Sequence, residues 1–104
     1  MTMPWLRDVA CFFAGAFLAN AAPHFIYGVC GDAFPTPFAK PPGKGLSSPT
    51  VNVVWALFNF AVGYGLLVAG RFSRHDSATL GICFAGFATM SILSSIGFAN
   101  KRPQ

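Results

Sequence analysis

The most constraining feature of this sequence is a set of three long stretches that contain no charged residue. These stretches are residues 9–31, 51–70 and 77–100. An apolar helix needs about 20 residues to cross the roughly 30 Å hydrocarbon core of a bilayer. Each stretch reaches that length, and charged residues lie in the breaks between them. The sequence therefore predicts three transmembrane helices, near residues 8–30, 50–71 and 77–99.

Composition argues against a water-soluble protein. Hydrophobic residues make up 54% of the 104 residues and charged residues only 10%, whereas soluble domains carry roughly 25% charged residues. The net charge is +4, but the Lys and Arg residues are scattered near the ends of the apolar stretches. They predict anchors at a membrane surface and not a nucleic-acid interface. We expect one all-α integral membrane domain over residues 1–104, a bundle of three helices whose partner is the lipid bilayer.

The break between the first two stretches, residues 31–49, is rich in proline. Proline fixes φ and lacks an N–H donor, so this loop is expected to be stiff and non-helical. At its end, Ser48 is expected to cap the second helix, with Pro49 in the first turn. The second break, residues 71–76, is short. It predicts that the second and third helices pack together as an antiparallel hairpin.

The first 21 residues also resemble a secretory signal peptide, because Ala19-Asn20-Ala21 fits an A-x-A cleavage site. The apolar run continues well beyond this site, and the positive charge of Arg7 is offset by Asp8. We therefore expect the segment to stay in place as a transmembrane helix. Whether residues 1–21 are cleaved in the cell stays open.

Polar residues inside the predicted spans are the main chemical lead. Asn20 and His24 are four residues apart and share a face of the first helix. Asn52, Trp55 and Asn59 share a face of the second helix. Because these helices are antiparallel, the two sets fall at matching depths, which predicts one buried polar cluster. It has three interpretations: hydrogen bonds between helices, a small ligand pocket capped by the loop, or axial ligation of haem or chlorophyll by His24.

Neither a catalytic site nor a metal site is indicated. The spans contain no carboxylate of the kind that a proton-coupled exporter uses as its switch. A histidine without an acidic partner is a poor general base. Cys11, Cys30 and Cys83 lack the spacing of a metal site or a disulfide framework. We expect a protein that is not an enzyme and binds no metal.

The third predicted helix carries small residues at steps of three and four. Such residues let two helix backbones approach closely. The predicted packing stripe consists of Ala78, Gly81, Ala85, Ala88 and Ser95. It favours packing against the first helix or, alternatively, self-association in an oligomer.

Several of these features form a longer pattern. It runs through Asn20-x-x-Pro23-His24-Phe25, Phe34-Pro-Thr-Pro-Phe38 and Ser47-Ser48-Pro49. The pattern resembles one in uncharacterised small bacterial inner-membrane proteins. The resemblance implies a location in the inner (plasma) membrane and brings no known activity, substrate or cofactor.

Three functions are compatible with these observations. The leading interpretation is an accessory or structural subunit, either a homo-oligomer or part of a larger membrane complex. The first alternative is a small-solute binding or transport module that uses the polar cluster around His24. The second is a holin-like pore former, which would share the length and the three spans.

Overall fold

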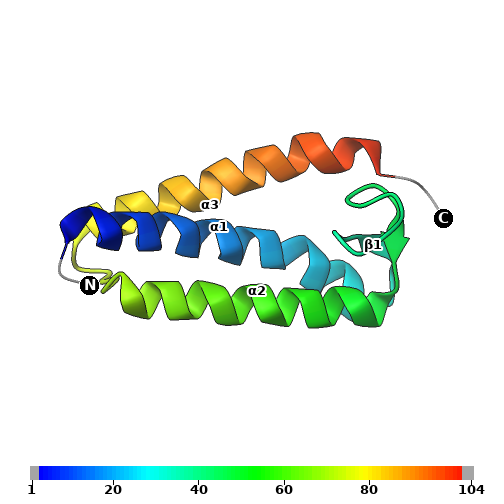
Figure 1. Ribbon diagram of the computed structural model, residues 1–104, viewed down its shortest axis with the longest axis horizontal. Coiled ribbons are helices and arrows are strands. Elements are labelled where there is room, and N and C mark those ends of the chain that lie inside the picture. The colour runs from blue at the N-terminus through cyan, green and yellow to red at the C-terminus, as the bar shows by residue number, and fades with distance from the viewer. Residues whose placement is uncertain (1–2, 102–104) are drawn as a thin grey trace.

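The computed structural model describes residues 3–101, and helices dominate it (Figure 1). Three long helices run along the 46 Å axis of the molecule. They are α1 (Pro4–Val29), α2 (Pro49–Ala69) and α3 (Ser77–Gly97), and the 3-10 helix η1 (Phe98–Asn100) follows α3. Strands β1 (Phe34–Pro35) and β2 (Leu46–Ser47) pair antiparallel within the first loop. All three long helices are long and apolar enough to cross a membrane, which agrees with the predicted spans.

The helix ends follow from local capping chemistry. α1 begins at Pro4, earlier than the predicted residue 8, because proline is well suited to the first turn of a helix. Ser48 caps α2 as predicted: its side-chain oxygen accepts a hydrogen bond from the Val51 N–H at 3.2 Å, and Pro49 is the first helical residue. Local sequence therefore determines where these two helices start.

α1 is the central helix of the fold. α2 and α3 each pack along α1, on different sides of it, and make few contacts with each other (Figure 1). The prediction that the short break at residues 71–76 brings α2 and α3 together as a hairpin is therefore wrong. The reason lies in α1, whose buried residues are nearly all Ala, Gly or Cys. Small side chains let a neighbouring helix approach the backbone, and α1 carries them on two sides.

Glycines mark the closest approaches between the helices. A Cβ atom at Gly86 of α3 would overlap the backbone carbonyl of Phe12, and one at Gly15 of α1 would overlap the carbonyl of Cys83. Where α2 meets α1, a Cβ atom at Gly28 would come within 2.8 Å of the Pro49 carbonyl oxygen. Because the glycines lack side chains, backbone contacts backbone at these crossings.

The predicted stripe on α3 does not make the contact with α1. Its residues Ala78, Gly81, Ala85 and Ser95 are exposed and Ala88 is half-buried. No described atom lies within 4 Å of a Cβ built at Gly81. Gly86 takes the inner position instead, and five residues along a helix correspond to a rotation of about 140°. The expectation that the stripe packs on α1 is therefore wrong, while self-association through the stripe stays a prediction.

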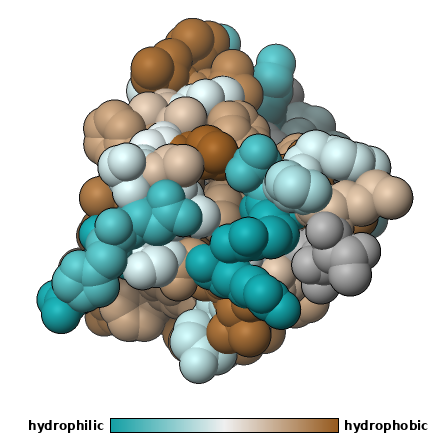
Figure 2. All heavy atoms as spheres, turned by 90° about the vertical axis from the view of Figure 1, so that its left-hand side faces the viewer, coloured by the Kyte–Doolittle hydropathy of each residue, from teal (hydrophilic) through white to brown (hydrophobic). Residues whose placement is uncertain are grey.

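Charged and apolar surfaces are separated along the molecule. Hydrophilic side chains gather at the end that holds the start of α1 and the α2–α3 break (Figure 2). Arg71, Arg74 and Asp76 are exposed there. The long outer faces of α2 and α3 are apolar, and only 6% of the most apolar window of α3 is buried within the chain. The molecule thus has polar ends and uncovered apolar sides.

Alanine at Gly86 is expected to destabilise the fold. The added methyl group would overlap the Phe12 carbonyl and push α3 from α1, which costs about 1–3 kcal/mol of unfolding free energy as overpacking. The same change at Gly81 adds a methyl group to open space and should leave stability equal or slightly higher, because alanine favours helix over glycine. Thermal unfolding in one detergent compares the two variants. Equal melting temperatures would contradict a crossing at Gly86.

Candidate functional site: the polar cluster and the cavity at His24

Asn52 is the centre of the polar cluster and is 0% exposed. The two N–H bonds of its Nδ2 group point to three backbone carbonyls, those of Phe34 at 2.9 Å, Ser47 at 3.2 Å and Ser48 at 3.0 Å, so one hydrogen is shared. Its Oδ1 atom lies 2.8 Å from Nδ1 of His24. One amide therefore joins the start of α2, both strands of the first loop, and α1.

Thr36 holds the first loop in the shape that Asn52 requires. Its hydroxyl lies 2.6 Å from that of Ser47 and accepts a hydrogen bond from the Phe38 N–H at 3.1 Å. The Thr36 carbonyl accepts from the N–H of Gly43 at 2.9 Å. These bonds turn the proline-rich segment into a compact cap over the helix ends. Thr36 is only 1% exposed and was not predicted as a site residue, although its place between two prolines is a usable signal.

A second pair of amides lies deeper in the cluster. The Nδ2 group of Asn59 donates to the carbonyl of Trp55 at 2.8 Å, and its Oδ1 atom accepts from Nδ2 of Asn20 at 3.0 Å. His24 thus pairs with Asn52, and Asn20 pairs with Asn59. This agrees with the prediction that these residues lie at matching depths on two antiparallel helices. The indole of Trp55 lies beside them, with its ring centroid 6.5 Å from that of His24. The structure therefore brings together all five residues of the predicted cluster.

Aromatic rings enclose the imidazole of His24, which is 1% exposed. Phe34, Trp55 and Phe98 meet it edge to face, with ring centroids 5.3, 6.5 and 5.9 Å away. Axial ligation of a haem or chlorophyll by His24 stays a prediction. Phe98 was not predicted as a site residue, since nothing in its local sequence places the end of α3 beside α1. Within residues 3–101, no group of three His, Cys, Asp or Glu side chains could hold a metal ion.

A cavity of about 110 Å³ adjoins this imidazole, and we call it the His24 cavity. Its lining residues are Asn20, His24, Thr36, Pro37, Gly43, Trp55 and Phe98. They come from α1, α2, the first loop and η1, so the cavity lies where all parts of the fold meet. One water occupies about 30 Å³ of the liquid, so the cavity has room for a small molecule.

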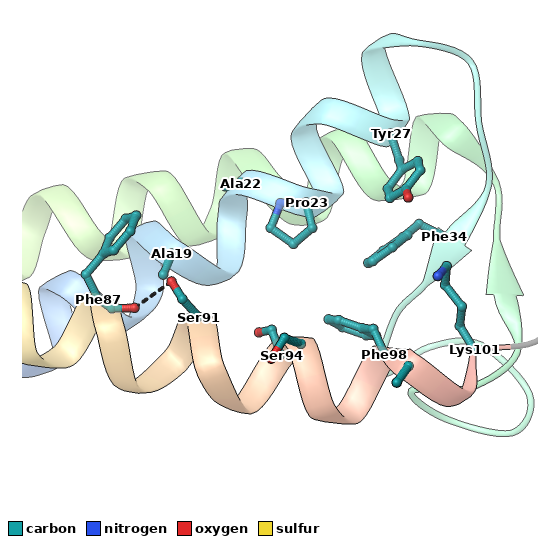
Figure 3. A pocket seen from close by; sticks show the side chains of 12 residues that line it. Ala19, Ala22, Pro23, Tyr27, Phe34, Phe87, Ser91, Ser94, Phe98 and Lys101 are labelled. Atoms are coloured by element: carbon teal, nitrogen blue, oxygen red, sulfur yellow. Dashed lines mark hydrogen bonds between the residues drawn. The ribbon is translucent and has the colours of Figure 1, made fainter.

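A larger hollow of about 430 Å³ separates the C-terminal halves of α1 and α3 (Figure 3). In Figure 3 the rings of Tyr27, Phe34 and Phe98 line this groove, and Lys101 lies at its end. The hydroxyl of Ser91 is already used, because it donates to a carbonyl of its own helix at 2.7 Å. The lining of the groove is mixed, because Ser94, Ser95 and Lys101 stand beside its aromatic rings. The His24 cavity differs in being lined by the imidazole and by side chains of the buried polar cluster.

No protein-family model, curated protein or solved structure matches this chain. The resemblance to small bacterial inner-membrane proteins therefore stays a prediction. Functional inference rests on the residues and geometry of the chain itself.

Replacing Asn52 with alanine is expected to loosen the cap. The change leaves carbonyls of the loop and Nδ1 of His24 without their partner, at a cost of about 2–4 kcal/mol of unfolding free energy. Asn59→Ala removes fewer bonds and should cost about 1–2 kcal/mol. Thermal unfolding tests the order of the two variants. Trypsin cleavage after Lys44 should accelerate in Asn52→Ala only, and equal cleavage of both variants would contradict the role of Asn52 in holding the loop.

Proposed function

We propose that this protein crosses a bacterial inner membrane three times and serves as a non-enzymatic accessory or structural subunit, in which α3 binds a partner helix. The distribution of charge supports the membrane arrangement. Arg71 and Arg74 lie at one end of the molecule, and Lys40, Lys44 and Lys101 belong to the segments at the other end. Cations at both ends of an uncharged body match the head-group regions of a bilayer.

The exposed stripe on α3 is the observation that carries the subunit proposal. Small residues at steps of three and four are typical of interfaces between membrane helices, where backbones approach closely. Within the chain, α3 already uses one glycine, Gly86, to contact α1. Ala78, Gly81 and Ala85 of the stripe offer a second, exposed surface, and no described part of the chain covers Gly81. Ser95, at the far end of the stripe, also borders the groove between α1 and α3.

The polar cluster is compatible with a structural role. The Asn52 and Asn59 amides both use their nitrogen and oxygen in hydrogen bonds within the chain. A pore-forming role has less support, because the asparagines and His24 lie between helices instead of along an exposed face.

Labelling of single cysteines tests the membrane arrangement. Lys44→Cys and Arg74→Cys, in a background with Cys11, Cys30 and Cys83 replaced by alanine, should react with a membrane-impermeant maleimide from opposite sides. This follows because α2 separates the two positions. Labelling of both positions from the same side would contradict a membrane-spanning α2.

Leucine at Gly81 is expected to disrupt the complex without unfolding the chain. Its side chain fits beside α3 in the isolated chain but would hold a partner helix away from the stripe. Native mass spectrometry after purification in mild detergent should show an oligomer or a co-purifying protein for the parent, and at least a tenfold loss in Gly81→Leu. The mass separates a second copy from another protein.

Gly97→Leu is the matched control for this experiment. Gly97 also has open space around it but lies off the stripe, so its variant should keep the complex. A monomeric parent, or equal complex formation by the two variants, would contradict the subunit proposal.

A further inference from the structure

The orientation of the Asn52 amide determines which nitrogen of His24 carries the proton. Three backbone carbonyls engage Nδ2 of Asn52, so Oδ1 is the atom that faces the imidazole. An amide oxygen can only accept a hydrogen bond, so Nδ1 of His24 must be the donor. The neutral imidazole then has an unprotonated Nε2. No residue within 3–101 donates a hydrogen bond to Nε2.

The deeper pair of amides follows the same logic. The carbonyl of Trp55 engages Nδ2 of Asn59, so Oδ1 of Asn59 faces Asn20 and accepts from its Nδ2 group. The Oδ1 atom of Asn20 is then left as an acceptor without a donor among the described residues. Both series of hydrogen bonds therefore begin at backbone carbonyls and end at an atom that can still accept: Nε2 of His24 in one series and Oδ1 of Asn20 in the other.

Trp55 adds one donor to this pair of acceptors. Its Nε1–H group is buried and has no acceptor among residues 3–101. His24, Asn20 and Trp55 all line the His24 cavity. A buried donor without a partner costs free energy, so a ligand that accepts from the indole gains from binding here. Three of the residues that line the cavity therefore carry two free acceptors and one free donor, and no Asp, Glu, Lys or Arg residue lines it.

We propose that the His24 cavity binds a small neutral molecule of the primary-amide or urea class. The NH₂ group of such a ligand would donate to Nε2 of His24 and to Oδ1 of Asn20, and its carbonyl would accept from Nε1 of Trp55. Pro37 and Gly43 of the first loop form the wall of the cavity on the loop side. This site does not depend on a partner of α3. The proposal therefore stands apart from the subunit function.

The position of the His24 proton is the first test and needs no ligand. In a His75→Gln variant His24 is the sole histidine, and ¹⁵N NMR of ¹⁵N-histidine-labelled protein should show a protonated Nδ1 and an unprotonated Nε2. A proton on Nε2 in the free protein would overturn the proposal, because the acceptor for the ligand would be missing.

Titration with acetamide is the second test. The chain has two tryptophans, so a Trp5→Phe variant leaves a single indole N–H resonance, that of Trp55. Acetamide should shift this resonance and the His24 Nε2 resonance along one saturable curve. N,N-dimethylacetamide has no N–H donor and should bind at least tenfold more weakly. A response that does not saturate would show that acetamide has no site here, and equal binding of the two amides would show that no NH₂ donor is recognised. Either result would overturn the proposal.

Two matched tryptophan variants separate binding from folding. With His24 as the reporter, Trp55→Phe keeps an aromatic wall but removes the donor, and acetamide should bind about five- to tenfold more weakly. Trp5→Phe changes an exposed tryptophan outside the cavity and should leave the affinity unchanged. Unchanged affinity in Trp55→Phe would exclude the indole donor. If that variant does not fold, the comparison of the two amides in the parent decides the question.

Discussion

The hydrogen bonds of the buried Asn52 amide are the interaction on which the rest of the structure depends. Their partners belong to three different parts of the chain: the α2 start, the first loop and His24 of α1. An apolar environment offers no water to replace a lost partner, so the amide and its partners stabilise one another. The loop can therefore be compact although it contains little regular structure. The position of the loop carbonyls also orients the Asn52 amide, and this amide in turn determines which nitrogen of His24 carries the proton.

The second constraint is the small size of the buried side chains on α1. Backbone contacts at Gly15 and Gly86 join α1 to the first half of α3. Beyond that crossing the helices diverge, and the groove opens between them (Figure 3). α2 instead follows α1 as far as the loop, because Asn52 and Asn59 bind side chains of α1 along its length. The two outer helices thus differ in their contacts with α1: α2 is bound along its length, and α3 mainly in its first half.

Much of the fold can be predicted from the sequence because charge and periodicity act locally. The uncharged stretches predict the three helices. The residue spacing within α1 and α2 places Asn20 and Asn59 at the same depth and so predicts that they pair. The assignment of helix faces cannot be predicted in the same way. α3 has small residues on two faces, and only the position of α1 decides that Gly86 is inside and Gly81 outside. Thr36 and Phe98 join the site through the path of the loop and the direction of α3, which are properties of the assembled fold.

Phe98 physically connects the two proposed activities. It follows the last residue of α3, and its ring lies 5.9 Å from His24 and 4.7 Å from Phe34. It lines both the His24 cavity and the groove. Because the second half of α3 has little support from α1, a partner helix on the stripe would restrict its movement. The proposed partner would therefore also hold in place Phe98, the wall that the His24 cavity shares with the groove.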